Sequence, residues 1–149
     1  MPRRAFAVLL AALVLGGTAT VGAASTSMPA AQPTIAVRSS SYGRILFDGR
    51  GFALYAFTRD PKRRSVCSGA CATAWPPYIV KGSLRAGQGA KRSLIGTTRR
   101  ANGSRQVTYA GRPLYFYIGD RKPGQVLCQN VREFGGLWLV VRQNGALVR

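Results

Sequence analysis

One short phrase occurs twice in this chain, and the repetition limits the folds that the chain can adopt. "ALYAFTRD" and "PLYFYIGD" both read Leu-Tyr-x-aromatic-x-x-Asp. Tyr55 and Tyr115 each precede an aspartate, Asp60 or Asp120, by five positions, and the copies are 115 − 55 = 60 residues apart. An internal repeat of this length normally reflects one supersecondary unit used more than once.

The residues that follow each phrase are repeated as well. Cys67 comes seven positions after the first aspartate, and Cys128 comes eight after the second. Trp75 and Trp138 follow their aspartates at 15 and 18 positions. Two copies are too few for an open solenoid, so we expect a closed domain with pseudo-twofold symmetry.

Short strand-like runs separated by turn signals predict the fold class. "FDGRGF", "ANGS" and "QNGA" each hold a pair typical of a hairpin turn, and "CSGACATAW" is the one convincing short helix, ended by two prolines. We therefore predict a mostly β fold, a small antiparallel β domain built from two diverged repeats with one short helix. Repeat one spans about residues 41–81, and repeat two spans about residues 94–142.

The N-terminus has the layout of a secretory signal peptide. Residues 1–23 begin with two arginines, continue with a short apolar run and end in small residues. Residues 24–40 are small, polar and proline-containing, which predicts a flexible leader before the domain at 41–149. No later apolar run is long enough to span a bilayer, so we expect no transmembrane segment after cleavage.

Charge is the strongest compositional signal. The chain holds 22 Lys and Arg against four acids and no His. Removal of the signal peptide takes away Arg3 and Arg4, so the net charge of the mature chain is 20 − 4 = +16. Such a field attracts polyanions, and export favours anionic cell-wall polymer or a membrane surface over nucleic acid, for which no specific recognition motif is present. The candidate anion-binding residues lie in basic clusters and are Lys62, Arg63, Arg64, Arg99, Arg100, Arg121 and Lys122. A further pair is Lys91-Arg92.

The repeated phrase itself is expected to be structural. Alternate residues of a strand share a face, so the rings of each copy should pack in the core while the aspartate caps the following turn. The alternative is that pseudo-symmetry joins the two carboxylates as an acid/base pair or a cation site. The motif residues are Tyr55, Phe57, Asp60, Tyr115, Tyr117, Asp120, Trp75 and Trp138. Both tryptophans are expected in the core, the alternative being stacking on a sugar.

Three cysteines in an exported chain predict one disulfide and one remaining thiol. Cys67 and Cys71 are spaced i, i+4, which brings their Cα atoms within disulfide range on a helix, but Cys128 could replace either one. Three pairings are therefore open. The alternative is that the three thiols bind copper(I) or zinc, or are redox-active.

Catalytic motifs are absent from the sequence. The lack of His removes Ser-His-Asp and Cys-His arrangements and most zinc hydrolases. No nucleophile elbow, phosphate-binding loop or dinucleotide fingerprint occurs. We expect a protein that is not an enzyme, with no metal and no cofactor.

The combined motifs are similar to those of a known family. The two Tyr-x4-Asp copies, "CSGACATAWPP" and "KPGQVLCQNVREFGGLWLVV" resemble the exported bacterial repeat proteins often called secreted or lipoprotein repeats of unknown function. The likeness covers about residues 41–141. It implies no general reaction. Many relatives are lipoproteins, but no cysteine precedes Cys67, so we expect a secreted or cell-envelope protein that is not lipid-anchored.

These observations combine into one functional expectation. The chain is expected to be an exported non-catalytic envelope or extracellular module of unknown specific role, held to anionic wall or membrane material by a basic surface. The alternative is a thiol-based metal-binding or redox protein that uses Cys67, Cys71 and Cys128.

Overall fold

The computed structural model describes residues 34–149, and the predicted signal peptide and leader residues 24–33 lie outside this range. The structure is mostly β, as predicted, with one short α-helix, α1 (Ala70–Ala74), and a 3-10 turn, η1 (Arg92–Leu94). The strands are β1 (Thr34–Ser40), β2 (Gly43–Asp48), β3 (Tyr55–Phe57), β4 (Arg85–Ala86), β5 (Ile95–Arg99), β6 (Arg105–Tyr109), β7 (Arg112–Pro113), β8 (Val131–Glu133) and β9 (Gly136–Val140).

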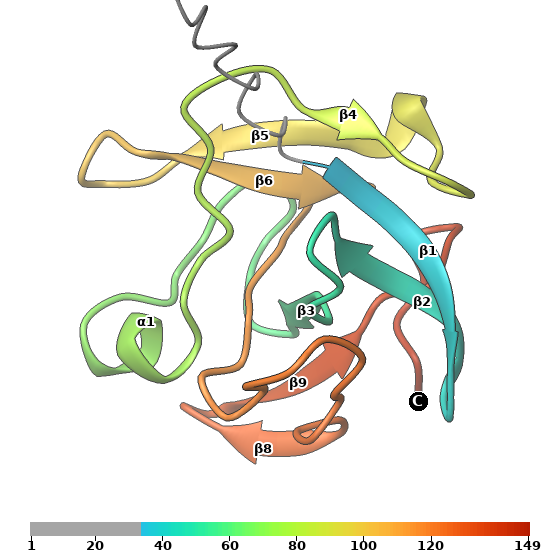
Figure 1. Cartoon of the computed structure of the whole chain (residues 1–149). Coiled ribbons are helices and arrows are strands. Elements are labelled where there is room, and N and C mark those ends of the chain that lie inside the picture. The colour runs from blue at the N-terminus through green and yellow to red at the C-terminus, as the bar shows by residue number, and fades with distance from the viewer. Residues whose placement is uncertain (1–33) are drawn as a thin grey trace, which may run out of the picture. The chain divides into compact units, whose positions relative to one another are not determined.

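Three small sheets make up the domain, in the strand orders β2-β1-β4, β3-β9-β8 and β5-β6-β7. Figure 1 shows the β5–β6 and β8–β9 hairpins at opposite ends of the view, with β3 between them. All neighbouring strands are antiparallel except the short β1–β4 pair. In the described part of the chain, no helix has the length and apolarity to cross a membrane.

Strand β1 corrects the prediction of a flexible leader, which is wrong for residues 34–40. This segment pairs with β2 along its whole length, and its Ile35 and Val37 side chains are buried. The carbonyl of Ile35 also accepts a hydrogen bond from the Gly87 N–H at 2.7 Å. Its alternating apolar residues are therefore a strand pattern, which the neighbouring Ser and Pro residues obscure in the sequence.

The predicted hairpin turns are present and have local causes. After β2, the Asp48 carboxylate accepts hydrogen bonds from the Arg50 N–H at 3.0 Å and the Phe52 N–H at 2.9 Å, which closes the turn. Between β5 and β6, Asn102 accepts from a backbone N–H two positions on, and Gly103 takes a φ of 81° that a glycine adopts without strain.

Each repeat completes its sheet with the other repeat. Strand β3 of repeat one pairs with β9 of repeat two, which places Phe57 opposite Trp138. In return, the Phe116 N–H of repeat two donates to the Pro76 carbonyl of repeat one at 2.8 Å, and the Ile118 N–H donates to the Ala74 carbonyl at 3.1 Å. Each repeat thus supplies backbone hydrogen-bond partners to the other.

The core consists of two buried clusters. Successive side chains of a strand point to opposite faces, so neighbouring residues belong to different clusters. In β2, Ile45 and Phe47 belong to one buried cluster, and Leu46 belongs to the other. In the same way Tyr55 and Phe57 of β3 share the first cluster. Both faces of these strands are therefore covered, so the central strands carry few polar side chains.

Candidate functional site

The two Tyr-x4-Asp copies are joined by reciprocal hydrogen bonds. The Tyr55 hydroxyl donates to Asp120 Oδ2 at 2.7 Å, and the Tyr115 hydroxyl donates to Asp60 Oδ2 at 2.5 Å. The two tyrosines also pair through their backbones, since each N–H donates to the carbonyl of the other at 2.9 Å. Each copy thus supplies the tyrosine for the aspartate of the other.

The second oxygen of each aspartate caps the loop that follows it, as expected. Asp60 Oδ1 accepts from the Val66 N–H at 2.7 Å, and Asp120 Oδ1 accepts from the Leu127 N–H at 2.9 Å. The two carboxylates share none of these donors. Burial raises the pKa of both aspartates above the usual range, because removal from water disfavours the charged form. Each carboxylate therefore bonds a tyrosine of the other repeat through one oxygen and its own loop through the second.

The two tryptophans stack on each other at the centre of the first core cluster. Their ring centroids are 4.0 Å apart and their planes differ by 4°. Phe57 stacks on the outer face of Trp138 at 4.3 Å, and Tyr117 lies against Trp75 at 4.8 Å. Both tryptophans are 0% exposed, so neither ring is open to a sugar from solvent. The predicted core positions are confirmed.

The indole nitrogens distinguish the two halves of the stack. Trp75 Nε1 donates to Glu133 Oε2 at 2.8 Å. Trp138 Nε1 is buried and has no hydrogen-bond acceptor among the described residues. The stack is therefore symmetric in its apolar contacts and asymmetric in its polar ones.

The structure selects one of the three cysteine pairings. Cys67 and Cys71 form a disulfide with Cα atoms 5.3 Å apart, and Cys128 is a buried free thiol whose pKa is raised by that burial. The three sulfurs therefore do not form one thiol site. Within residues 34–149, no group of three or more His, Cys, Asp or Glu side chains is placed to hold a metal ion.

The predicted anion-binding residues have different environments. Arg100 is half-buried and bonded internally, since it donates to Ser65 Oγ at 2.7 Å, Gln106 Oε1 at 2.6 Å and the Cys67 carbonyl at 2.6 Å. Lys62 and Arg63 line a pocket of about 460 Å³ beside β5. The remaining candidates are exposed on the surface and are Arg64, Arg99, Arg121 and Lys122.

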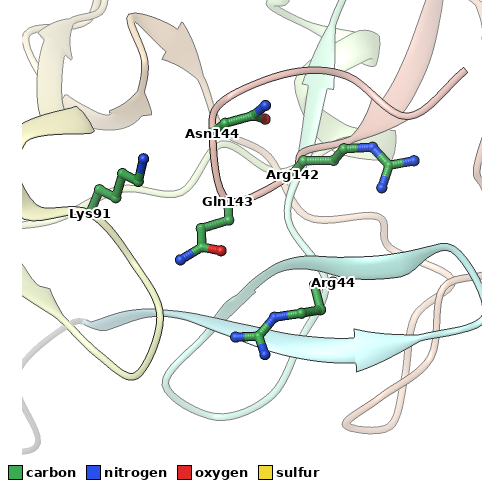
Figure 2. A pocket seen from close by; sticks show the side chains of 5 residues that line it. All are labelled: Arg44, Lys91, Arg142, Gln143 and Asn144. Atoms are coloured by element: carbon green, nitrogen blue, oxygen red, sulfur yellow. The ribbon is translucent and has the colours of Figure 1, made fainter.

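A second basic pocket lies outside the predicted set. Arg44, Lys91 and Arg142 line it together with Gln143 and Asn144, and its volume is about 290 Å³ (Figure 2). The three cations come from β2, from the loop before η1 and from the segment after β9. Only Lys91 belongs to a basic cluster in the sequence, and no linear pattern indicates that the three meet.

Comparison with known proteins identifies the family and nothing more specific. A family described as a secreted repeat of unknown function matches residues 36–78 and 96–142, which correspond to the two repeats seen in the structure. No curated protein and no solved structure matches the chain. The two matched segments cover more than half of the sequence, and the chain therefore belongs to this family of secreted repeats of unknown function.

Proposed function

We propose that this protein is a non-catalytic module of the cell envelope or the extracellular space, and that its basic surface associates with anionic wall polymer or anionic membrane. The observation that carries the proposal is the charge imbalance of the folded domain. Residues 34–149 contain 20 Lys and Arg and four acids, a difference of 20 − 4 = +16. A field of this sign and size concentrates polyanions at the surface.

The few acids form almost no ion pairs with the surface cations, because the fold uses their carboxylates in internal hydrogen bonds. Asp48 forms the one ion pair of the described residues, with Arg50 at 2.7 Å. Asp60 and Asp120 accept from tyrosines of the opposite repeat, and Glu133 accepts from Trp75. The exposed arginines and lysines thus have almost no carboxylate partners within the domain.

The same contacts support a non-catalytic role. The two aspartates that could act as a pair are each occupied by a tyrosine hydroxyl and a backbone N–H. Two of the three sulfurs are held in a disulfide, and the third is buried. The family is described as secreted, which supports an extracellular location, and we propose that charge rather than a lipid anchor retains the protein there.

The test is retention of the purified mature protein on isolated cell walls. We expect the walls to hold the protein at about 50 mM salt and to release most of it at about 500 mM, because screening shortens the reach of surface charges. Walls from which the anionic polymers have been extracted should retain much less. Retention that does not respond to ionic strength or to polymer removal contradicts the proposal.

A further inference from the structure

The pocket in Figure 2 has a framework that is held by buried contacts. Tyr109 is 0% exposed, and its hydroxyl accepts from the Lys91 N–H at 3.0 Å while donating to the Gln143 carbonyl at 2.7 Å. Gln143 Nε2 donates to the Gly89 carbonyl at 2.6 Å. One buried hydroxyl therefore fixes two walls of the pocket, and a side-chain amide ties them to a third segment.

Two glycines leave room for the arginines of the pocket. A Cβ atom at Gly43 would lie 3.3 Å from Arg142 Nη1, and a Cβ atom at Gly89 would lie 3.1 Å from Arg44 Nη2. The guanidinium groups thus rest close to the main chain at positions that carry no side chain. Arg142 is placed there by its bridge to Ile45 of β2.

Apart from the side-chain oxygen of Gln143, the pocket presents donors and positive charge. The one ion pair within residues 34–149 is Arg50–Asp48, so Arg44, Lys91 and Arg142 have no carboxylate partner there. The Asn144 Oδ1 atom accepts from the Ala146 N–H at 3.0 Å, which leaves its NH₂ group as the available end. A ligand for these side chains must therefore be rich in acceptors and negatively charged.

Size and spacing indicate more than a single ion. The pocket volume of about 290 Å³ is about ten times the share of one liquid water. Figure 2 shows the three cationic ends set apart around Gln143 instead of directed at one point. A chain with successive anionic groups can reach all three, whereas one small anion contacts fewer of them.

The arrangement of the donors favours phosphate over carboxylate groups. A guanidinium group binds either anion through two parallel hydrogen bonds and an ammonium group binds either as a point charge, so the geometry of the anion makes the difference. Phosphate oxygens point in tetrahedral directions, so one group can accept from donors on two walls, whereas a carboxylate accepts in one plane. The donors here come from three chain segments and approach from different sides.

We propose that the pocket formed by Arg44, Lys91, Arg142, Gln143 and Asn144 binds a phosphodiester polymer of the envelope. This inference rests on the proposed function and assigns its ligand class and its site. The polymer repeat places one anionic phosphate after another, which matches the separated cations. Attraction by the remaining surface charge brings the polymer to the protein, and the pocket holds it.

The experiment measures binding of the mature protein to poly(glycerol phosphate) by titration calorimetry, with polyglutamate and single-stranded DNA as comparison polyanions. The pocket variant is R44Q/K91Q/R142Q, and the matched control is K81Q/R85Q/R132Q, which removes the same charge from exposed residues outside the pocket. We expect the pocket variant to weaken poly(glycerol phosphate) binding at least tenfold and the control to weaken it less than threefold. The slope of log affinity against log salt should become shallower by about two for the pocket variant. Circular dichroism checks that both variants are folded.

Each outcome decides a separate point. Equal losses for the two variants overturn the pocket and leave only a general field. An equal loss of polyglutamate binding in the pocket variant overturns the preference for phosphodiesters, and tighter binding of DNA than of poly(glycerol phosphate) overturns the assignment to an envelope polymer. If the soluble polymer binds through the pocket but intact walls do not retain the protein, the pocket is supported and the proposed wall association fails.

Discussion

The two Tyr–Asp sites of the domain have the same geometry and different surroundings. Each aspartate accepts from a tyrosine hydroxyl of the other repeat and from a backbone N–H in the loop after it. At the Asp60 site, the Tyr115 hydroxyl also bonds Ser65 Oγ at 2.7 Å, and Arg100 donates to that serine. At the Asp120 site, the neighbouring polar group is the Cys128 thiol, which raises the pKa of Tyr117 by hydrogen bonding to it.

The comparison distinguishes the hydrogen bonds that both sites share from the contacts that differ between them. The bonds common to both sites are those that join one repeat to the other, so both copies retain them. The partners around them are a disulfide with an arginine in one half and a free thiol in the other. The site with fewer alternative partners, that of Asp120, should be the more sensitive to mutation.

The largest effect is expected at the stacked tryptophans, which belong equally to both halves. W75A and W138A should each lower the free energy of unfolding by about 3–5 kcal/mol, because a large buried ring leaves a cavity. The double variant should cost less than the sum, since each single change already removes the shared stack. Guanidinium unfolding followed by circular dichroism measures this. F134A, at an exposed aromatic residue, is the control, and strictly additive tryptophan effects would contradict the shared stack.

Substitution of the aspartates tests the asymmetry directly. D120A should cost about 3 kcal/mol and D60A about 2 kcal/mol, because each leaves a tyrosine hydroxyl and a backbone N–H without their acceptor, at about 1–3 kcal/mol for each buried donor. Tyr115 retains Ser65 as a partner, whereas Tyr55 loses its side-chain acceptor. Urea unfolding gives both values.

The control for the aspartate variants also removes the tyrosine hydroxyl that loses its acceptor. Addition of Y55F to D120A should recover about 1 kcal/mol, because no buried hydroxyl is then left unpaired. A larger loss for D60A than for D120A would show that the Asp60 surroundings are essential instead of auxiliary.

Substitution of the cysteines that follow each aspartate should lower the free energy of unfolding by different amounts. C67S/C71S should cost about 2 kcal/mol through loss of a short covalent loop, while C128S should cost about 1 kcal/mol. Mass spectrometry after alkylation should find one thiol in the unfolded, unreduced protein. In the folded protein burial raises the pKa of Cys128, so its alkylation at pH 7.5 should be much slower than that of free cysteine. Fast alkylation of the folded protein would show that the thiol is accessible.

The last effect is a pH dependence shared by both sites. Burial, and then the hydrogen bond to aspartate, raises the pKa of Tyr55 and of Tyr115 above that of an exposed tyrosine, and burial raises the pKa of Tyr78 to about 12. The unfolded chain ionises first, near pH 10, so this stability is present below pH 10 and is lost as the pH rises. The loss should be about 1.4 kcal/mol per pH unit for each tyrosine.

Unfolding measured at pH 9, 10 and 11 tests the sign and the size of this loss. Y55F should lower the slope of the free energy of unfolding against pH by the equivalent of one proton. Stability that rises between pH 10 and pH 11 would contradict the raised tyrosine pKa values.

Local chemistry made much of this fold predictable. The packing of Tyr55 and Phe57 on one side follows from the period of a strand, and the capping by Asp60 follows from its side-chain length. Strand β1 is not evident in the sequence because the Ser and Pro residues around it obscure its alternating apolar residues, and its pairing with β2 is seen only in the fold. The choice of Cys67–Cys71 over the other pairings also depended on the three-dimensional structure.

The relation between the two repeats could not be derived from their order in the chain. The sequence shows two copies, but not that each aspartate takes the tyrosine of the other copy. The pocket residues Arg44, Lys91 and Arg142 are separated by 91 − 44 = 47 and 142 − 91 = 51 residues. Only the folded topology brings such distant residues to one pocket, so charge clustering in the sequence indicated other positions.

The reciprocal exchange has a consequence for the origin of such chains. A polypeptide with one copy would have an aspartate without its tyrosine and a strand without its neighbour, and two such polypeptides could satisfy each other through a twofold interface. Fusion of the two into one gene product replaces a concentration-dependent dimer by an intramolecular contact, which persists however dilute the secreted protein becomes. After fusion the two halves can change in sequence independently, so one can acquire a disulfide while the other keeps a thiol.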